Sequence, residues 1–340
     1  MRFMSAGESH GRCLIALLEG LPAGLTVDLR VIDADLARRQ QGYGRGGRMQ
    51  IEKDTVTILS GLKAGKTIGS PVTLMIENRD FKIDELPAVY EPRPGHADLS
   101  GALKYGFSDM RCVLERASAR ETAARVAAGA LCRIFLKEFG VNISSRVVSV
   151  AGESDQKKIN KKIDAARKSG DTLGGIFEVH AENVPLGLGS YVHYDRRLDA
   201  RLAFALMSIP AIKGVEFGLG FAACAKRGSE VHDAIYYSAR KGFYRKTNNA
   251  GGVEGGMSNG RPLIIRCAMK PIATLGTPLP SVDIRTKKKV PASIQRSDIA
   301  AVEAAGVIAE AMTAITLSDA FLERYGQDDI KRIKRAYKAG

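Results

Sequence analysis

The sequence predicts an α+β fold whose sheets are mixed or antiparallel. Short runs of β-branched and aliphatic residues, typical of strands, stand at irregular intervals, at 54–59, 71–76, 176–182 and 262–268. Longer segments with a helical spacing of apolar residues lie among them, at 33–40, 118–139, 157–169, 196–208 and 298–325. Strands and helices do not alternate strictly and no dinucleotide-binding fingerprint is present, which disfavours a doubly wound parallel sheet.

The chain of 340 residues contains neither a low-complexity linker nor a repeat, so we expect one domain over residues 1–340. Its five cysteines are widely spaced and form no C-x-x-C pair. This argues against a structural zinc site or a disulfide framework and favours a cytoplasmic location. The apolar run 13–18 ends at Glu19, and the apolar segment near the C-terminus contains Glu303 and Glu310. We therefore expect neither a secretory signal nor a membrane span.

A formal net charge of +14 predicts that the protein attracts anions. Lysine clusters such as 287–289 are typical of a solvated surface. Arginines that stand among glycines and small residues instead suit bidentate binding of phosphate or carboxylate. The arginines in such settings are Arg38, Arg39, Arg45, Arg48, Arg111, Arg116, Arg120 and Arg296.

Two helix starts lie beside these arginines. Ser118 and Glu121 are spaced as a capping box, so Arg116 would precede a helix N-terminus, where free N–H groups favour an anion. An ordinary helix start with a solvated arginine explains the same residues. Ser297 or Asp298 would cap the helix 298–325, which accounts for both residues structurally, although a neighbouring arginine also allows an anion contact.

Two further segments are candidates for ligand contact. The glycines in 248–262 would let a ligand approach the main chain closely, but a flexible surface loop explains them equally well. This segment matches neither the P-loop nor the dinucleotide-binding pattern. The segment 270–274 (KPIAT) places a lysine near a small hydroxyl, a combination that suits phosphate.

His10 and His96 are displayed in loops framed by glycine or proline, and near neutral pH an imidazole is well suited to proton transfer. His180, His193 and His232 lack this framing and are interpreted as structural or surface residues. No third ligand follows at a familiar spacing, so we expect no metal. Ser9 is adjacent to His10 and lies in no nucleophile elbow, which excludes a serine hydrolase.

Taken together, these stretches resemble the chorismate synthase family in order and approximate spacing, from about residue 3 to residue 325. They read GESHG, RRQQGYGRGGRM, RPGHADLSGALKYGFSDMRCVLERASARETAARVAAGA, ALMSIPAIKGVEFGLGF, NNAGGVEGGMSNG, MKPIAT and QRSD. The resemblance implies one large domain, a β-α-β sandwich of antiparallel sheets and packed helices, that assembles as a homotetramer. It also implies a lyase that converts 5-enolpyruvylshikimate 3-phosphate to chorismate and phosphate by anti-1,4-elimination and requires reduced FMN.

The resemblance assigns catalytic roles to His10, His96 and Asp298. One histidine would protonate the departing phosphate and the other would act at the flavin, with Asp298 near flavin N5. Substrate contacts would come from Ser9, Arg39, Arg45, Arg48 and Arg111, and the family also assigns Arg39 and Arg45 to NADP(H). FMN contacts would come from Arg116, Ala117, Ser118, Pro210, Ala211, Gly255, Lys270, Pro271, Ile272, Ala273, Thr274 and Arg296.

The chain departs from the family pattern at several places. Ser297 stands where many members have histidine, and Pro210 replaces a common amide, so any flavin contact there uses the backbone or packing. The regions 150–175 and 275–295 lack long insertions, which favours reduced FMN supplied from outside over reduction by the enzyme's own use of NADPH.

Two other functions are weighed against the lyase. A nucleic-acid-binding protein would use 42–48 as an RGG-like segment, but aromatics make up only 6% and do not interleave with the basic residues, so we expect no nucleic-acid partner. A flavin reductase would turn over NADPH without the phosphorylated substrate.

Overall fold

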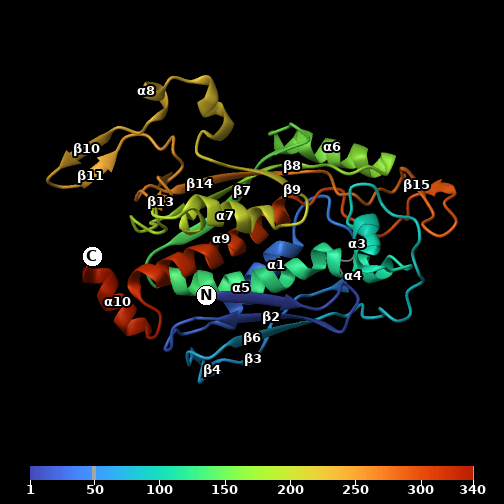
Figure 1. Cartoon of the computed structure of the whole chain (residues 1–340), viewed down its shortest axis with the longest axis horizontal. Helices are drawn as coiled ribbons and strands as arrows, with labels where there is room; N and C mark the ends of the chain where they lie inside the picture. Colours follow the sequence, from blue (N-terminus) through green and yellow to red (C-terminus); the bar gives the residue numbers. More distant parts are fainter. Residues whose placement is uncertain (48–50, 340) are drawn as a thin grey trace.

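The computed structural model describes residues 1–47 and 51–339 and contains two four-stranded sheets with helices between them (Figure 1). The first sheet has the order β1(Arg2–Ala6), β2(Cys13–Glu19), β6(Val72–Glu77), β3(Thr57–Ser60). The second has the order β7(Asn142–Val150), β8(Gly175–Glu182), β14(Leu263–Met269), β9(Ile212–Phe217). The described strands of both sheets pair antiparallel, which confirms the α+β fold.

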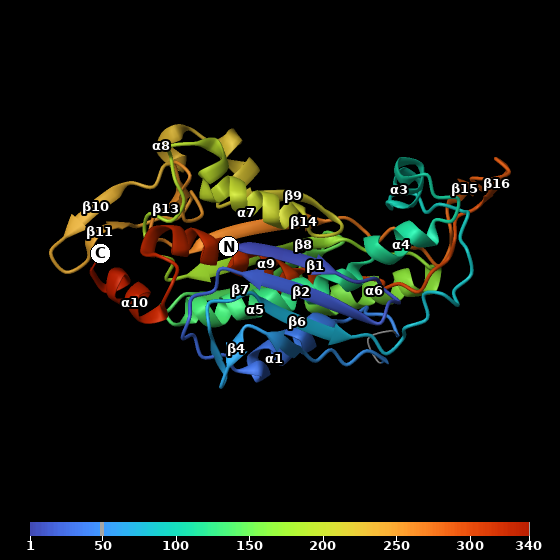
Figure 2. The ribbon, with the colours of Figure 1, turned by 60° about the horizontal axis from the view of Figure 1, so that its bottom comes forward.

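The helices between the sheets are α1(Leu29–Gln40), α5(Thr122–Lys137), α7(Leu198–Met207) and α9(Val302–Tyr325). Figure 2 brings the first sheet forward, with α5 and α9 behind it. These two helices cross closely because Gly129 has no side chain: a Cβ there would lie 2.3 Å from Cβ of Ala311.

Alternate residues of the strands face this helical layer. In β2 the side chains of Leu14, Ala16 and Leu18 are at most 1% exposed, as expected for a strand with one buried face. One cluster of buried apolar residues runs through both sheets and the helices between them. Helix α9 is long and apolar enough to cross a membrane, but 89% of its apolar stretch is buried inside the protein, so its hydropathy is that of a core helix.

The other elements lie around this framework. The hairpin β10–β11 and α8 project at one end of the molecule, whereas α3, α4 and the β15–β16 hairpin lie at the other (Figures 1 and 2). Their bounds and those of the remaining short elements are β4(Leu62–Lys63), β5(Lys66–Thr67), α3(Asp98–Tyr105), α4(Arg111–Ala117), η1(Ala119–Glu121), α6(Gln156–Ser169), η2(Tyr194–Arg196), η3(Gly220–Ala225), α8(Gly228–Val231), β10(Ile235–Ser238), β11(Gly242–Arg245), β12(Val253–Glu254), β13(Met257–Ser258), β15(Pro280–Val282), β16(Lys289–Pro291) and α10(Ile330–Ala339).

The structure corrects both predicted helix caps. Ser118 Oγ accepts from Arg120 N at the start of the 3-10 turn η1, and Glu121 accepts hydrogen bonds from Ser5 and Arg125 instead of closing a capping box. Helix α9 begins at Val302, after Ser297 and Asp298, and within the described chain no side chain caps it. The hydroxyl and carboxylate there serve other contacts, because the described residues that lead up to Val302 form no helical turn.

Candidate active site

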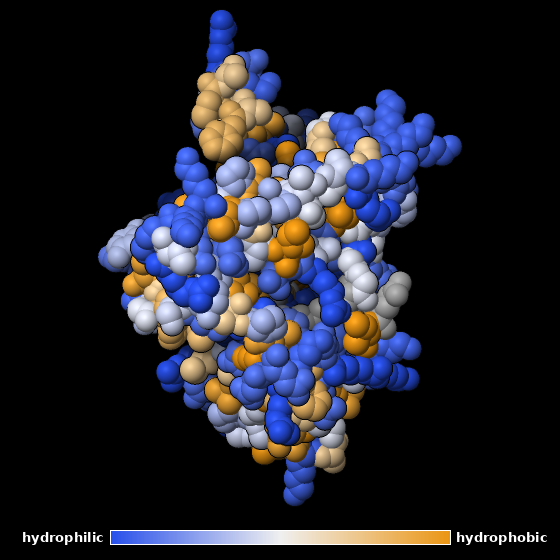
Figure 3. Space-filling model, turned by 90° about the vertical axis from the view of Figure 1, so that its right-hand side faces the viewer, coloured by the Kyte–Doolittle hydropathy of each residue, from blue (hydrophilic) through white to orange (hydrophobic). Residues whose placement is uncertain are grey.

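The loops that carry the candidate catalytic residues lie at the end of the molecule that holds α3 and α4. Figure 3 faces this end and shows a largely hydrophilic surface with scattered hydrophobic residues. The exposed apolar side chains of this region include Phe81, Leu103, Tyr105 and Phe107. Cationic side chains on the candidate loops or in contact with them, Arg45, Arg116 and Lys270, suit an anionic ligand.

His10 lies in the tight loop that joins β1 to β2. Gly7 has φ +105°, and a Cβ there would lie 2.3 Å from the Cys13 carbonyl, so the loop requires glycine at this position. Glu115 of α4 accepts from the His10 backbone N–H at 2.8 Å and contacts His10 Nδ1 at 2.9 Å. The other ring nitrogen, Nε2, lies 4.0 Å from Asp80 Oδ2. The imidazole is therefore held through Nδ1.

Asn78 supports the same loop from its other side. Its Nδ2 donates to the carbonyls of Glu8 and Gly11 at 3.1 and 2.7 Å, and its Oδ1 accepts from Arg120 Nε at 2.8 Å. Arg120 in turn binds the buried Asp54 at 2.6 Å. This network ties the histidine loop to an ionic cluster inside the protein.

His96 is paired with a carboxylate in the same manner. Its Nδ1 lies 2.5 Å from Asp98 Oδ1, and Arg93 donates to the same carboxylate from Nε at 2.8 Å and from Nη2 at 3.0 Å. Burial alone would raise the pKa of Asp98, but the hydrogen bonds from His96 and Arg93 hold that pKa far below its usual value. Asp98 is thus an anion at neutral pH.

The segment 270–274 packs on the His96 loop. The Lys270 ammonium donates to the Gly95 carbonyl, and Arg93 donates to Thr274 Oγ1 at 2.7 Å. Lys270 N donates to the carbonyl of Ala211 at 2.9 Å, so the segment around residue 210 joins the same region. Burial, helped by Lys213, lowers the pKa of Lys270.

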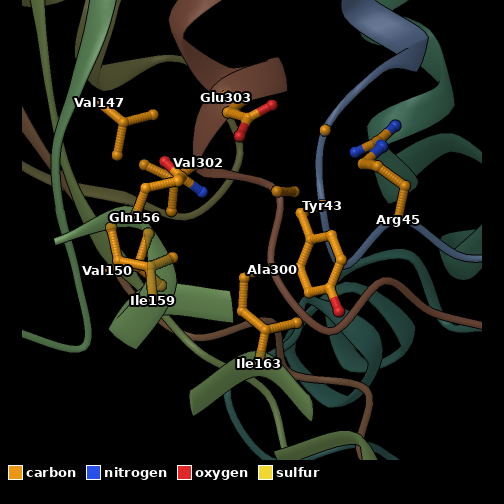
Figure 4. Close-up of a pocket in the computed structure, with 12 residues that line it drawn as sticks. Tyr43, Arg45, Val147, Val150, Gln156, Ile159, Ile163, Ala300, Val302 and Glu303 are labelled. Atoms are coloured by element: carbon orange, nitrogen blue, oxygen red, sulfur yellow. The ribbon is translucent and has the colours of Figure 1, made fainter. Parts of the chain in front are cut away.

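Asp298 pairs with the loop that carries the clustered arginines. Arg45 Nη1 lies 2.7 Å from Asp298 Oδ2, and the Gly46 N–H donates to Asp298 Oδ1 at 2.6 Å. Figure 4 shows a pocket behind this loop, with Arg45 at the edge opposite Val147 and Val150. The residues lining that pocket are mostly apolar and include none of the three candidate catalytic residues, so we do not place the active site there.

The remaining predicted arginines differ in their surroundings. Arg39 is buried, donates to Thr122 Oγ1 at 3.0 Å and to the Ala119 carbonyl at 3.1 Å, and burial lowers its pKa to about 10. Arg111 is buried and donates to the Pro87 carbonyl. Arg116 is exposed and donates to the Gly7 carbonyl at 2.8 Å. Arg48 lies outside the described residues.

The structure places the other predicted site residues as follows. Ser9 is buried and its N–H donates to the Glu115 carbonyl at 2.9 Å, whereas Arg296 is exposed. Gly255 lies in the turn of the β12–β13 hairpin, whose Gly252 packs on Pro262 and Leu263 at the amino end of β14, whereas Lys270 follows the carboxyl end of that strand. The seven residues of β14 span about 20 Å. Gly255 is therefore not brought to the histidines within one chain.

Sequence reasoning did not identify Glu115, Asp98, Arg93 or Asn78 as parts of the site. Asp98 and Arg93 carry a local signal, because they stand two residues after and three residues before His96. Glu115 is 105 positions from His10, so only the folded chain brings the two together. Across residues 1–47 and 51–339, no group of three His, Cys, Asp or Glu side chains is arranged to hold a metal ion.

Comparison with known proteins places the chain in one family. A family model described as chorismate synthase matches residues 1–322. Chorismate synthase of Thermoanaerobacter pseudethanolicus is 55% identical over 342 residues, which cover 100% of this chain and 98% of the relative. Chorismate synthase of Aquifex aeolicus is 49% identical, with 99% and 96% covered. A solved structure described as "Crystal Structure of Chorismate Synthase" superposes with a TM-score of 0.82 at 43% identity, covering 99% of this chain and 96% of that one.

The family model, the curated relatives and the solved structure all match this chain over nearly its whole length. The chain is therefore an enzyme of the lyase class. It belongs to the chorismate synthase family, which acts in the shikimate pathway.

Proposed function

We propose that the enzyme eliminates phosphate from 5-enolpyruvylshikimate 3-phosphate by an anti-1,4-elimination that yields chorismate and requires reduced FMN. The observation that carries this proposal is the pair of histidines, His10 and His96, each bound through Nδ1 to a buried carboxylate. The cationic side chains of Arg116 and Lys270 contact the loops that carry them. Such a pair can move protons while cations bind a substrate with one phosphate and two carboxylates.

Substrate binding is proposed for Ser9, Arg39, Arg45, Arg48 and Arg111. Arg45 is the best placed of these, because its contact with Asp298 leaves it next to a candidate catalytic residue. Arg39 faces the buried Asp54, so its contribution to anion binding would act through the local positive potential. Its assignment to NADP(H), like that of Arg45, stays a prediction.

The residues assigned to FMN fit a phosphorylated flavin in their chemistry. Lys270 and Thr274 supply an ammonium and a hydroxyl beside the backbone of Pro210–Ala211, on the loop of His96. Arg116, Ala117 and Ser118 lie on α4 and directly after it, next to the His10 loop. Pro271, Ile272, Ala273 and Arg296 belong to the same proposed set, as does Gly255. When bound, reduced FMN supplies the electronic assistance that the elimination requires.

The protein's own groups would control the protons. One histidine would hold a proton at Nε2 for the departing phosphate, and the other would act beside the flavin. Asp298 would accept a proton at a carboxylate oxygen. Its contacts with Arg45 and Gly46 occupy both oxygens, so one of these contacts must lengthen, or the oxygen must also accept the proton while the contact persists. Phosphate leaves more readily once protonated, because the developing negative charge is then reduced.

We propose further that residues 1–340 form a single catalytic domain that works in the cytoplasm as a homotetramer, without a nucleic-acid or membrane partner. The position of Gly255 supports assembly. An FMN contact from Gly255 must come from a second copy of the chain, since within one chain it lies at the opposite end of β14.

The function is tested by phosphate release from 5-enolpyruvylshikimate 3-phosphate under anaerobic conditions. We expect release with chemically reduced FMN and none with oxidised FMN. Adding NADPH to the oxidised sample then decides whether the enzyme reduces its own flavin. Oxidation of NADPH without substrate and without any elimination would instead make the protein a flavin reductase.

A further inference from the structure

Both candidate catalytic histidines contact a buried carboxylate that the family resemblance does not assign. The Glu115 side chain is 1% exposed and the Asp98 side chain 0%, while the two histidine side chains are 18% and 19% exposed. A histidine in a site whose Nδ1 meets a fixed carboxylate has its tautomer and ring orientation set by that contact.

The two pairs differ in what else the carboxylate binds. Asp98 is shared between His96 and Arg93. Both oxygens of Glu115 instead contact His10. The His10 backbone N–H donates to Oε2 at 2.8 Å, and the ring Nδ1 lies 2.9 Å from Oε1 and 3.0 Å from Oε2. The Arg111 guanidinium lies 3.7 Å from Oε1. Glu115 therefore gives the clearer test.

The direction of the hydrogen bond follows from the charge of Glu115. Burial raises the pKa of this carboxyl, but the hydrogen bonds from His10 and the charge of Arg111 outweigh burial and leave the pKa below its ordinary value. Two of these contacts, the His10 backbone N–H at 2.8 Å and the Arg111 guanidinium at 3.7 Å, favour the ionised form whichever ring nitrogen carries the hydrogen. An ionised carboxylate only accepts hydrogen bonds, so His10 Nδ1 must carry the hydrogen. Nε2 then faces the other side of the ring, where Asp80 is 4.0 Å away and itself binds Lys82 at 2.7 Å.

We propose that Glu115 is the positioning residue that fixes His10 as its Nδ1–H tautomer and presents Nε2 for proton transfer. Asp98 likewise contacts His96 Nδ1, but Arg93 Nη2 lies 3.0 Å from that same nitrogen, so the assignment is made for His10 alone. The catalytic consequence rests on the proposed elimination, whereas the tautomer is a property of the protein alone and can be measured without flavin or substrate.

Glu115→Gln inverts the tautomer with little change in shape. The backbone N–H of His10 is a fixed donor at Oε2, so it retains the single oxygen of the glutamine amide. The amide NH2 then faces Nδ1 and makes that nitrogen an acceptor, which moves the ring proton to Nε2. Glu115→Ala removes the contact altogether and leaves both tautomers populated.

The test measures ring-nitrogen chemical shifts of 15N-histidine-labelled protein, without ligands, at a pH where the ring is neutral. We expect Nδ1–H for His10 in the wild type, Nε2–H in Glu115→Gln and a mixture in Glu115→Ala. In the elimination assay, kcat of Glu115→Gln should fall by about 100-fold or more while KM changes little.

Asp195→Asn is the matched control, because His193 Nδ1 lies 2.8 Å from Asp195 in an exposed pair. It should leave kcat and the His10 signals unchanged. The proposal is overturned if wild-type His10 carries its proton on Nε2, or if Glu115→Gln changes the tautomer without lowering kcat. If the wild type eliminates no phosphate at all, the proposed function fails. The NMR signals alone then still decide whether Glu115 sets the tautomer of His10.

Discussion

The Lys270 ammonium donates a hydrogen bond to the backbone carbonyl of Gly95, the residue that precedes His96. A second contact, from Arg93 to Thr274, joins the same two segments. A segment proposed to bind the flavin is therefore fastened to the loop of a proposed catalytic histidine. A substitution in one segment should therefore alter the position of the other.

Lys270→Met should weaken binding of reduced FMN by about 10-fold or more, because a charged hydrogen-bond donor is lost from a half-buried position. It should also lower kcat by loosening the His96 loop. Anaerobic titration of reduced flavin measures the affinity. Lys241→Met, in the distant β10–β11 turn, is the control and should bind flavin normally. Unchanged affinity in Lys270→Met would remove Lys270 from the flavin site.

His10→Ala should lower turnover by about 100-fold to 10,000-fold, the range expected for loss of a general acid or base. The loop should keep its path because the Ser9 N–H still donates to the Glu115 carbonyl. Circular dichroism and the elution volume on gel filtration should therefore match the wild type. Near-native turnover in this variant would show that His10 has no catalytic role.

Asp298 has a structural contact besides its proposed role as a base. Asp298→Ala loses both the Gly46 contact and the base, whereas Asp298→Asn keeps an oxygen that can accept from the Gly46 N–H. If Asp298 acts as a base, both variants should lose most turnover. Recovery of near-native turnover in Asp298→Asn would make the residue a structural anchor for the Arg45 loop.

Stability should fall as the pH is lowered, through Glu115 and Asp98. Both carboxyls have a folded pKa below their ordinary values of 4.5 and 3.8, so the unfolded chain binds protons first as the pH falls. The stabilisation is present above those values and is lost progressively below them. Urea unfolding across this range should show a smaller loss in Glu115→Gln than in the wild type, and equal losses would contradict the assigned direction.

Gly129→Ala should destabilise the protein by about 1–3 kcal/mol, the range typical of overpacking. The new Cβ would lie 2.4 Å from Cα of Ala311, at the crossing of α5 and α9. The control is Gly214→Ala in β9, whose added Cβ meets Ala268 Cβ at an ordinary 3.6 Å. Denaturant midpoints compare the two variants, and a Gly129→Ala midpoint equal to that of the control would show that the helices separate freely.

The sequence predicts those elements whose burial pattern is strong. The predicted helix 157–169 corresponds to α6, which has one apolar face, and the predicted strand 176–182 corresponds to β8, which has a buried centre. Such patterns can be recognised in the sequence. Helices α3 and α4 escape prediction: they are short, and each carries a buried charged residue, Asp98 or Glu115, whose partners become apparent only in the folded chain. The cap predicted at Asp298 fails for a similar reason, since its carboxylate has a partner 252 positions away in sequence, at Gly46.

The central claim is that this enzyme makes chorismate and phosphate together and only with reduced flavin. The most direct measurement follows both products in one anaerobic reaction with 5-enolpyruvylshikimate 3-phosphate. We predict equal amounts of chorismate and phosphate with reduced FMN, and neither with oxidised FMN. Phosphate without chorismate, or equal rates with the two flavin states, would contradict the account.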